Sequence, residues 1–128
     1  MFERAAPDLA GLMLASVVYS GRDGLPASFD PRIVGEARSL VGLVVTDDLS
    51  VPALVRAVGG DPAEVVRRAL LAGNDILLST LPPDLERGGV DHVEIVRAHA
   101  ASDPAAAAAV DAACARVLRA KILAGLLP

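Results

Sequence analysis

Short apolar runs alternate along this chain with longer segments that have helical periodicity. The apolar runs at 12–19, 42–46 and 75–80 are nearly continuous rather than alternating. Continuous apolar runs of this length are typical of strands that are buried on both faces of a parallel sheet. The alternation of strand and helix also favours parallel pairing. We therefore expect an α/β fold with about three parallel strands, lying side by side, and flanking helices.

Helix start and stop signals punctuate the segments between these runs. Asp30-Pro31 and Asp61-Pro62 each place an Asp N-cap before a proline at the first helical position. Gly73 is a C-terminal stop signal. Within the second of these helices Arg67 and Arg68 lie off the apolar stripe, where we expect them to be solvated. The sequence predicts helices at 31–40, 51–58 (capped by Ser50), 62–72, 91–100 and 104–123.

Composition and charge exclude several classes of protein. The 128 residues carry a net charge of −4 with a single lysine, Lys121, which argues against a nucleic-acid surface. The first apolar run, 9–19, is too short to span a bilayer, and no export signal precedes it. We expect a cytoplasmic protein. Cys114 is the one cysteine, so it forms no internal disulfide, and we expect it to be buried in its alanine-rich helix.

Two adjacent carboxylates, Asp47 and Asp48, end the central apolar run. The C-terminal ends of parallel strands are where α/β proteins bind ligands, so the pair marks a candidate site. Because side chains alternate along a strand, Asp47 and Asp48 should point in different directions. The alternative is a capped turn, in which both carboxylates accept backbone N–H groups at the start of the next helix.

The residues around this pair resemble those of family 3 glycoside hydrolases, in the β-N-acetylhexosaminidase branch. Val44-Val45-Thr46-Asp47-Asp48-Leu49-Ser50 resembles the nucleophile segment at the end of barrel strand seven, a hydrophobic strand followed by Ser/Thr-Asp-Asp-Leu-Ser. The similarity extends over nearly the whole chain: 13–17 resembles strand six, 26–31 the loop after it, 69–78 the junction into strand eight, and 116–121 the closing helix.

The resemblance implies a partial TIM-type (β/α) barrel. A complete barrel takes about 250 residues, so residues 1–128 would form a single partial barrel domain corresponding to strands six to eight with their helices. Leu14, Val44 and Leu77 are the side chains that we expect to face the barrel interior. The open sheet edges, 12–19 and 76–80, would favour association of the chain with itself.

The same resemblance implies retaining hydrolysis of terminal β-linked N-acetylglucosamine, with a carbohydrate as substrate and no cofactor. Asp47 matches the nucleophile, and Asp48 and Ser16 lie where the substrate binds. Ser16 occupies the position of a sugar-binding histidine in the family's Met-x-x-His. The family's acid/base, a His-Asp pair after strand five, and its Lys-His-Phe-Pro-Gly-His segment have no counterpart here. We therefore expect little or no activity from the chain alone; the alternative is a non-catalytic association or binding module.

Other polar residues carry weaker signals. Asp75 enters the third strand at the end opposite the site. His92 and His99 lie on a peripheral helix and should be solvated; without a cysteine or a close histidine partner they predict no metal site. An Asp-Asp pair at a strand end is also typical of phospho-acceptor receiver domains, which bind magnesium. Those domains need a separate acceptor strand and a late strand-end lysine, and neither is present in this sequence.

Overall fold

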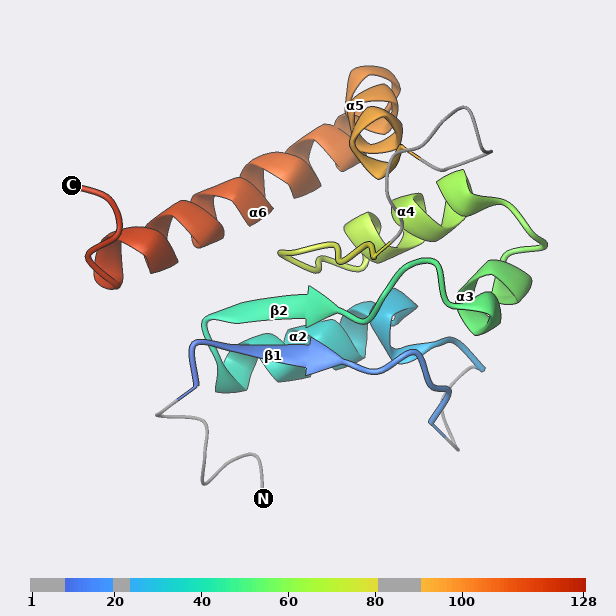
Figure 1. Ribbon diagram of the computed structural model, residues 1–128, viewed down its shortest axis with the longest axis horizontal. Helices are drawn as coiled ribbons and strands as arrows, with labels where there is room; N and C mark the ends of the chain where they lie inside the picture. The colour runs from blue at the N-terminus through green and yellow to red at the C-terminus, as the bar shows by residue number, and fades with distance from the viewer. Residues whose placement is uncertain (1–8, 20–23, 81–90) are drawn as a thin grey trace.

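The structure is a computed structural model that describes residues 9–19, 24–80 and 91–128. It confirms the α/β class, with a small parallel sheet and five α-helices among these residues (Figure 1). The elements in chain order are β1 (Gly11–Leu14), the 3-10 helix η2 (Ala27–Phe29), α2 (Pro31–Leu40), β2 (Leu43–Thr46), α3 (Pro52–Ala57), α4 (Pro62–Leu71), α5 (His92–Ser102) and α6 (Pro104–Leu123).

The sheet is smaller than the sequence predicts. β1 and β2 are parallel, as expected, and their register runs from Gly11 opposite Leu43 to Leu14 opposite Thr46. Regular pairing of the first strand ends at Leu14 rather than near residue 19. The expected third strand is reduced to a single parallel bridge between Val45 and Ile76.

The third segment, 75–80, nevertheless follows β2 on the side opposite β1. The backbone N–H of Thr46 donates to the carbonyl of Ile76 (3.0 Å), and Asp75 N–H donates to the carbonyl of Val44 (2.8 Å). Further along, the N–H of Leu78 donates to the Thr46 hydroxyl (3.0 Å) instead of to a backbone carbonyl. Because this side chain takes the place of a backbone acceptor, the segment stays beside β2 without forming a regular ladder.

The helix boundaries agree closely with the sequence, although two local predictions are wrong. Asp30 and Asp61 cap α2 and α4 as predicted, each accepting the backbone N–H two residues ahead. Ser50 does not cap α3, because its hydroxyl donates to the Asp48 carboxylate (2.8 Å). Arg67 and Arg68 are not simply solvated, since both are ion-paired with Glu64 at 2.8 Å.

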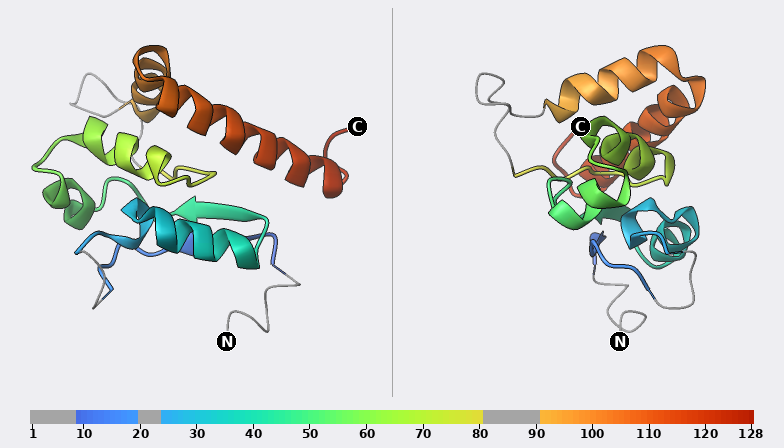
Figure 2. Two further views of the ribbon diagram at one scale, coloured as in Figure 1. Left: turned by 180° about the vertical axis from the view of Figure 1, so that it is seen from behind. Right: turned by 90° about the vertical axis from the view of Figure 1, so that its right-hand side faces the viewer.

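The two faces of the sheet differ in what covers them. α2 packs on one face and buries Leu14 and Val44 together with Val34 and Ala37 (Figure 2). Leu77 packs against the neighbouring core that α4 contributes. The prediction that Leu14, Val44 and Leu77 face a barrel interior is therefore wrong.

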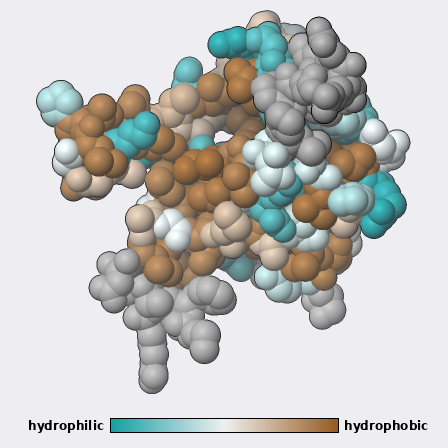
Figure 3. Space-filling view, viewed as in Figure 1, coloured by the Kyte–Doolittle hydropathy of each residue, from teal (hydrophilic) through white to brown (hydrophobic). Residues whose placement is uncertain are grey.

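On the opposite face lie the register partners Met13 and Val45, with Ile76 beside them. This face is turned toward the viewer in Figure 1, and Figure 3 shows apolar side chains gathered on that side of the molecule. The sequence could not decide between the faces, because a continuous apolar run is apolar on both.

Two remaining expectations concern single features of the chain. Cys114 is exposed, so the prediction that it is buried is wrong: α6 turns Ala106 and Ala113 toward its neighbours instead. No helix within the described ranges is long and apolar enough to cross a membrane. The cytoplasmic location stays a prediction from the sequence.

Candidate active site

Asp47 lies at the C-terminal end of β2, where the strand leaves the sheet. Its backbone N–H donates to the carbonyl of Leu14 (3.0 Å), which ties the residue to the end of β1. One carboxylate oxygen accepts the N–H of Ser16 (3.3 Å), and the other accepts the N–H of Asp48 (2.9 Å). The side chain is half-buried. Asp47 is thus oriented by backbone groups and is still open to solvent.

Asp48 turns toward different neighbours. One of its oxygens accepts the N–H of Ser50 (3.0 Å), and the other accepts the Ser50 hydroxyl (2.8 Å). The hydroxyl of Thr80 also donates to Asp48, which connects β2 to the end of the segment beside it. Asp48 therefore forms the capped turn that the sequence offered as an alternative, whereas Asp47 faces β1.

These contacts change the pKa of Asp48. Partial burial by itself raises the pKa, but the hydrogen bonds from Thr80 and Ser50 outweigh that effect and lower the pKa to about 2. Asp48 is consequently a carboxylate acceptor at neutral pH and has no proton to give to a leaving group.

Ser16 lies on the β1 side of Asp47. Its backbone N–H contacts the Asp47 carboxylate, as described above. Its hydroxyl oxygen is buried and has no hydrogen-bond partner among the described residues. Ser16 and Asp47 thus lie together at one edge of the site, and Asp48 and Thr80 lie together at the other.

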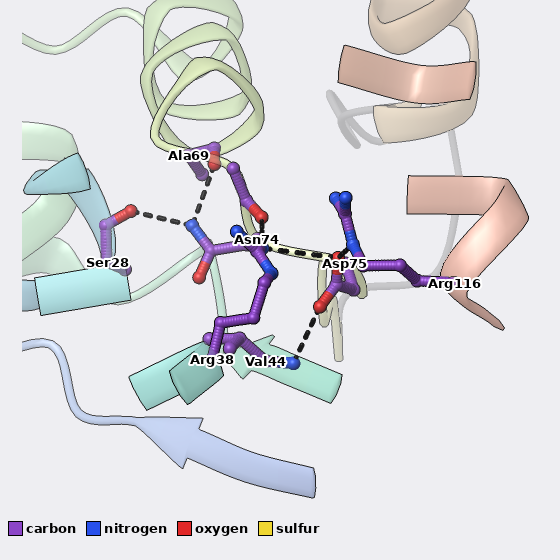
Figure 4. A network of polar contacts seen from close by, with 8 residues as sticks. Ser28, Arg38, Val44, Ala69, Asn74, Asp75 and Arg116 are labelled. Atoms are coloured by element: carbon purple, nitrogen blue, oxygen red, sulfur yellow. Dashed lines mark hydrogen bonds and ion pairs between the residues drawn. The ribbon is translucent and has the colours of Figure 1, made fainter. Parts of the chain in front are cut away.

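A second carboxylate, Asp75, lies at the opposite end of β2, as its place at the start of the third segment predicts. Its side chain is fully buried and accepts the backbone N–H of Val44 (2.8 Å). Arg38 from α2 (3.3 Å) and Arg116 from α6 both pair with it (Figure 4). Both guanidinium groups bond to Asp75, so this cluster fastens α2 and α6 to the strand.

Next to this cluster, Asn74 is a buried residue that the sequence did not single out. Its side-chain amide donates to the carbonyl of Ser28 (2.8 Å) and to the carbonyl of Ala69 (2.7 Å). These bonds join the end of α4 to η2 (Figure 4). The sequence signal that could have identified Asn74 is its position directly after Gly73 at the end of a helix, because the carbonyls at a helix end need donors.

The histidines lie in the helical layer. His99 Nε2 is 3.1 Å from the carbonyl oxygen of Ala63 in α4, so the prediction of a solvated His99 is wrong. His92 is half-buried in the first turn of α5. Within the described ranges no group of three or more His, Cys, Asp or Glu residues could hold a metal ion.

The arrangement provides one kind of chemistry. A carboxylate that is half-exposed, fixed by two N–H donors and placed at the C-terminal end of a parallel strand can act as a nucleophile or as a hydrogen-bond acceptor for a ligand. The groups bonded to Asp47 in the described parts of the chain are backbone N–H groups. The proton donor that a leaving group needs is not among them.

Comparisons with known proteins show which family the chain belongs to. The family profile described as the glycosyl hydrolase family 3 N terminal domain matches residues 2–120. The fold is similar to the crystal structure of a β-N-acetylhexosaminidase from Beutenbergia cavernae, at 39% sequence identity and a TM-score of 0.69. That similarity covers 88% of this chain and 33% of the other, so this chain spans about a third of that enzyme. A comparison with curated proteins gave no match. The chain belongs to glycosyl hydrolase family 3.

Proposed function

We propose that this chain forms part of a retaining glycosidase that acts on terminal β-linked N-acetylglucosamine, with Asp47 as the nucleophile. The observation that carries the proposal is the Asp47 carboxylate, half-open at the C-terminal end of β2 and held by the N–H groups of Ser16 and Asp48. The chain that carries this carboxylate belongs to family 3, and a solved structure to which its fold is similar is that of a β-N-acetylhexosaminidase.

In the proposed reaction an Asp47 oxygen attacks the anomeric carbon while the bond to the leaving oxygen breaks. A general acid gives that oxygen a proton, and the sugar is left as an ester of Asp47. Water, deprotonated by the same acid/base group, then attacks the anomeric carbon and releases Asp47. The two N–H donors hold the carboxylate in one orientation, which lowers the cost of reaching the attacking geometry.

Ser16 and Asp48 are proposed as residues of the sugar site. Ser16 borders the proposed sugar site because its backbone N–H donates to the Asp47 carboxylate (3.3 Å). Asp48 acts through the residues it holds, because its oxygens are already engaged by Ser50 and Thr80. It positions the turn that carries Asp47.

We further propose that residues 1–128 correspond to strands six to eight of a (β/α) barrel, and that the chain alone has little or no activity. General acid–base assistance is worth about 10²–10⁴-fold in rate, and no described side chain next to Asp47 can provide it. The isolated chain should therefore hydrolyse a chromogenic N-acetylglucosaminide no faster than its Asp47→Asn variant does.

A chimera tests the role of Asp47 directly. The matched third of the Beutenbergia cavernae enzyme is replaced by this chain, and hydrolysis of the chromogenic substrate is measured. Asp47→Asn should lower kcat at least about 10³-fold, because it removes the attacking group. A 5-fluoro sugar substrate, whose ester hydrolyses slowly, should label a peptide that contains Asp47.

Matched variants complete the test. Asp111→Asn, an exposed carboxylate on α6, should leave the chimera unchanged. Asp48→Asn should lower kcat less than Asp47→Asn does and should still allow the label to form. A chimera that keeps its rate when Asp47 is replaced, or that is labelled elsewhere, would contradict the proposal.

A further inference from the structure

A cavity lies at the N-terminal end of β2, the end of the strand opposite Asp47. It has a volume of about 330 Å³ and lies between the end of α2, the turn into β2 and the C-terminal half of α6. Figure 1 shows α6 passing this end of the strand. Three of its lining residues are Arg38, Arg116 and Arg119, and we call this space the arginine cavity.

Two of these arginines use only part of their donor capacity inside the fold. Arg38 donates through Nη2, to Asp75 (3.3 Å) and to the carbonyl of Gly73. Arg116 donates to Asp75 through Nε (2.5 Å), and its two terminal nitrogens point away from that carboxylate in Figure 4. A guanidinium group carries five N–H donors. Most donors of both arginines therefore have no partner among the described residues.

The third arginine gives the cavity an excess of positive charge. Arg119 is exposed on α6 and bonds to none of the other described residues. None of the described residues that line the cavity is acidic, and the side chain of the nearby Asp75 is fully buried. Three guanidinium charges against the one carboxylate of Asp75 leave a net charge of +2. This charge favours an anion in the cavity.

The size of the charge selects among anions. A guanidinium group binds the oxygens of a phosphate or a carboxylate through pairs of parallel hydrogen bonds. A monocarboxylate brings one negative charge, whereas a phosphate monoester carries about −1.5 to −2 at neutral pH. The net charge of +2 is balanced by one phosphate monoester and only half balanced by a monocarboxylate.

The rest of the lining suits an organic group. Val41, Ala120 and Leu123 form an apolar wall of the cavity. Val41 is 8% exposed and Leu123 is 79% exposed, so this wall extends from the interior of the protein to its surface. A volume of about 330 Å³ lies at the lower end of the range for small-molecule sites. The wall and the volume together favour a small molecule with an apolar part next to its phosphate.

We propose that the arginine cavity binds a small-molecule phosphate monoester. The dianionic head group accepts hydrogen bonds from the three guanidinium groups, and the organic part lies against the apolar wall. The bound molecule connects α2 to α6 at the N-terminal end of β2. This inference goes beyond the proposed glycosidase function and does not depend on it, because Asp47 lies at the other end of the strand.

Isothermal titration calorimetry of the full chain tests the site, with phenyl phosphate as the probe. At about pH 8 the probe is a dianion, and we expect one-to-one binding with a Kd below about 1 mM. Phenyl sulfate has the same shape and one charge fewer, so it should bind at least about 5-fold more weakly. Inorganic phosphate lacks the apolar group and should also bind at least about 5-fold more weakly.

A variant of Arg119 locates the binding site without disturbing the Asp75 cluster. Arg119→Gln should weaken phenyl phosphate binding at least about 5-fold, because it removes a charged donor from the cavity. Arg56→Gln is the matched control, since Arg56 is exposed on α3 and bonds to none of the other described residues. This control should keep the affinity of the wild type.

A second pair of variants tests the shape of the cavity. Ala120→Leu places a larger side chain in the apolar wall and should weaken binding at least about 10-fold, because it occupies the space of the organic group. Ala115→Leu makes the same change at an exposed position of α6 outside the cavity and should leave the affinity unchanged. Circular dichroism of all variants checks that they fold.

The results separate this site from the candidate active site. Asp47→Asn should bind phenyl phosphate as tightly as the wild type does, and a loss of binding in this variant would place the probe at the other end of β2 and overturn the inference. A Kd above about 1 mM, or an Arg119→Gln variant that binds like Arg56→Gln, would also overturn it. Phenyl sulfate or inorganic phosphate bound as tightly as phenyl phosphate would contradict the assignment to a phosphate monoester.

Discussion

The two ends of β2 each hold a carboxylate cluster, and the clusters are built in opposite ways. At the N-terminal end, Asp75 is fully buried and paired with Arg38 and Arg116. At the C-terminal end, Asp47 is half-exposed, and the groups that hold it within the described parts of the chain are backbone N–H groups. In the first cluster the carboxylate charge is paired with arginines inside the fold, whereas the second leaves a carboxylate open to a ligand.

The difference shows how the fold divides stability from chemistry. The Asp75 cluster connects β2 to α2 and α6, so its loss would loosen three elements (Figure 4). Asp47 contacts the end of β1 and its own neighbour, so the fold depends on it less. Barrel-type α/β proteins follow the same rule, with stability at the N-terminal ends of the strands and activity at the C-terminal ends.

The largest expected effect comes from Asp75. Asp75→Asn should lower the free energy of unfolding by about 3 kcal/mol, because it leaves two arginines beside a buried position without their counter-charge. This is the low end of the range for buried pairs, since both arginine side chains are 31% exposed. Urea unfolding followed by circular dichroism measures it. Asp47→Asn is the comparison and should cost less than about 1 kcal/mol; equal losses would break the distinction between the two ends.

Asn74 should come next. Asn74→Ala removes a buried amide that donates to the carbonyls of Ser28 and Ala69, and both acceptors then lose their partner. We expect a loss of about 2 kcal/mol in the same unfolding experiment. Ser39→Ala, an exposed hydroxyl on α2, is the control and should change the free energy of unfolding by less than about 0.5 kcal/mol. An Asn74→Ala variant as stable as this control would show that the amide bonds contribute nothing.

The pH dependence of stability tests the other end of β2. The folded-state pKa of Asp48 is about 2, below its ordinary value of 3.8, so the carboxylate form stabilises the fold. This contribution is fully present above about pH 5 and is lost as the pH falls toward 2. We expect it to amount to about 1 kcal/mol, a reduced figure because Thr80 is exposed to solvent.

The measurement compares the wild type with Asp48→Asn from pH 2 to pH 7. The difference in unfolding free energy should be constant above pH 5 and should shrink between pH 4 and pH 2. Thr80→Val should reduce the same difference, because it removes the hydroxyl donor to Asp48. A difference that does not vary with pH would contradict the contacts of Asp48.

The smallest expected effect comes from Glu64 on α4, which is a partly exposed counterpart of the buried Asp75 cluster. Glu64, like Asp75, pairs with two arginines, Arg67 and Arg68, and their hydrogen bonds lower its pKa to about 2. All three side chains are partly exposed, at 24% to 39%. Glu64→Gln should therefore cost only about 0.5 kcal/mol by urea unfolding. A loss as large as that of Asp75→Asn would mean that burial does not explain the strength of the Asp75 cluster.

The sequence by itself determined the local features. The caps at Asp30 and Asp61 are as predicted, and the helices that follow them agree with the predicted bounds to within one residue, because these features depend on contacts within a few residues. The family was also readable from the sequence, since the segment from Val44 to Ser50 resembles the nucleophile segment of family 3, and the family profile matches residues 2–120.

Only the tertiary structure decided the partners of the polar residues and the faces of the sheet. Asp75 meets Arg116 from 41 residues away, and Asp48 meets Thr80 from 32 residues away. No local rule specifies such pairs, because they form only when packing brings the elements together. The helices cover Leu14 and Val44 and leave Met13 bare. A continuous apolar strand can bury either of its two faces, so the packing of α2 decided which face is covered.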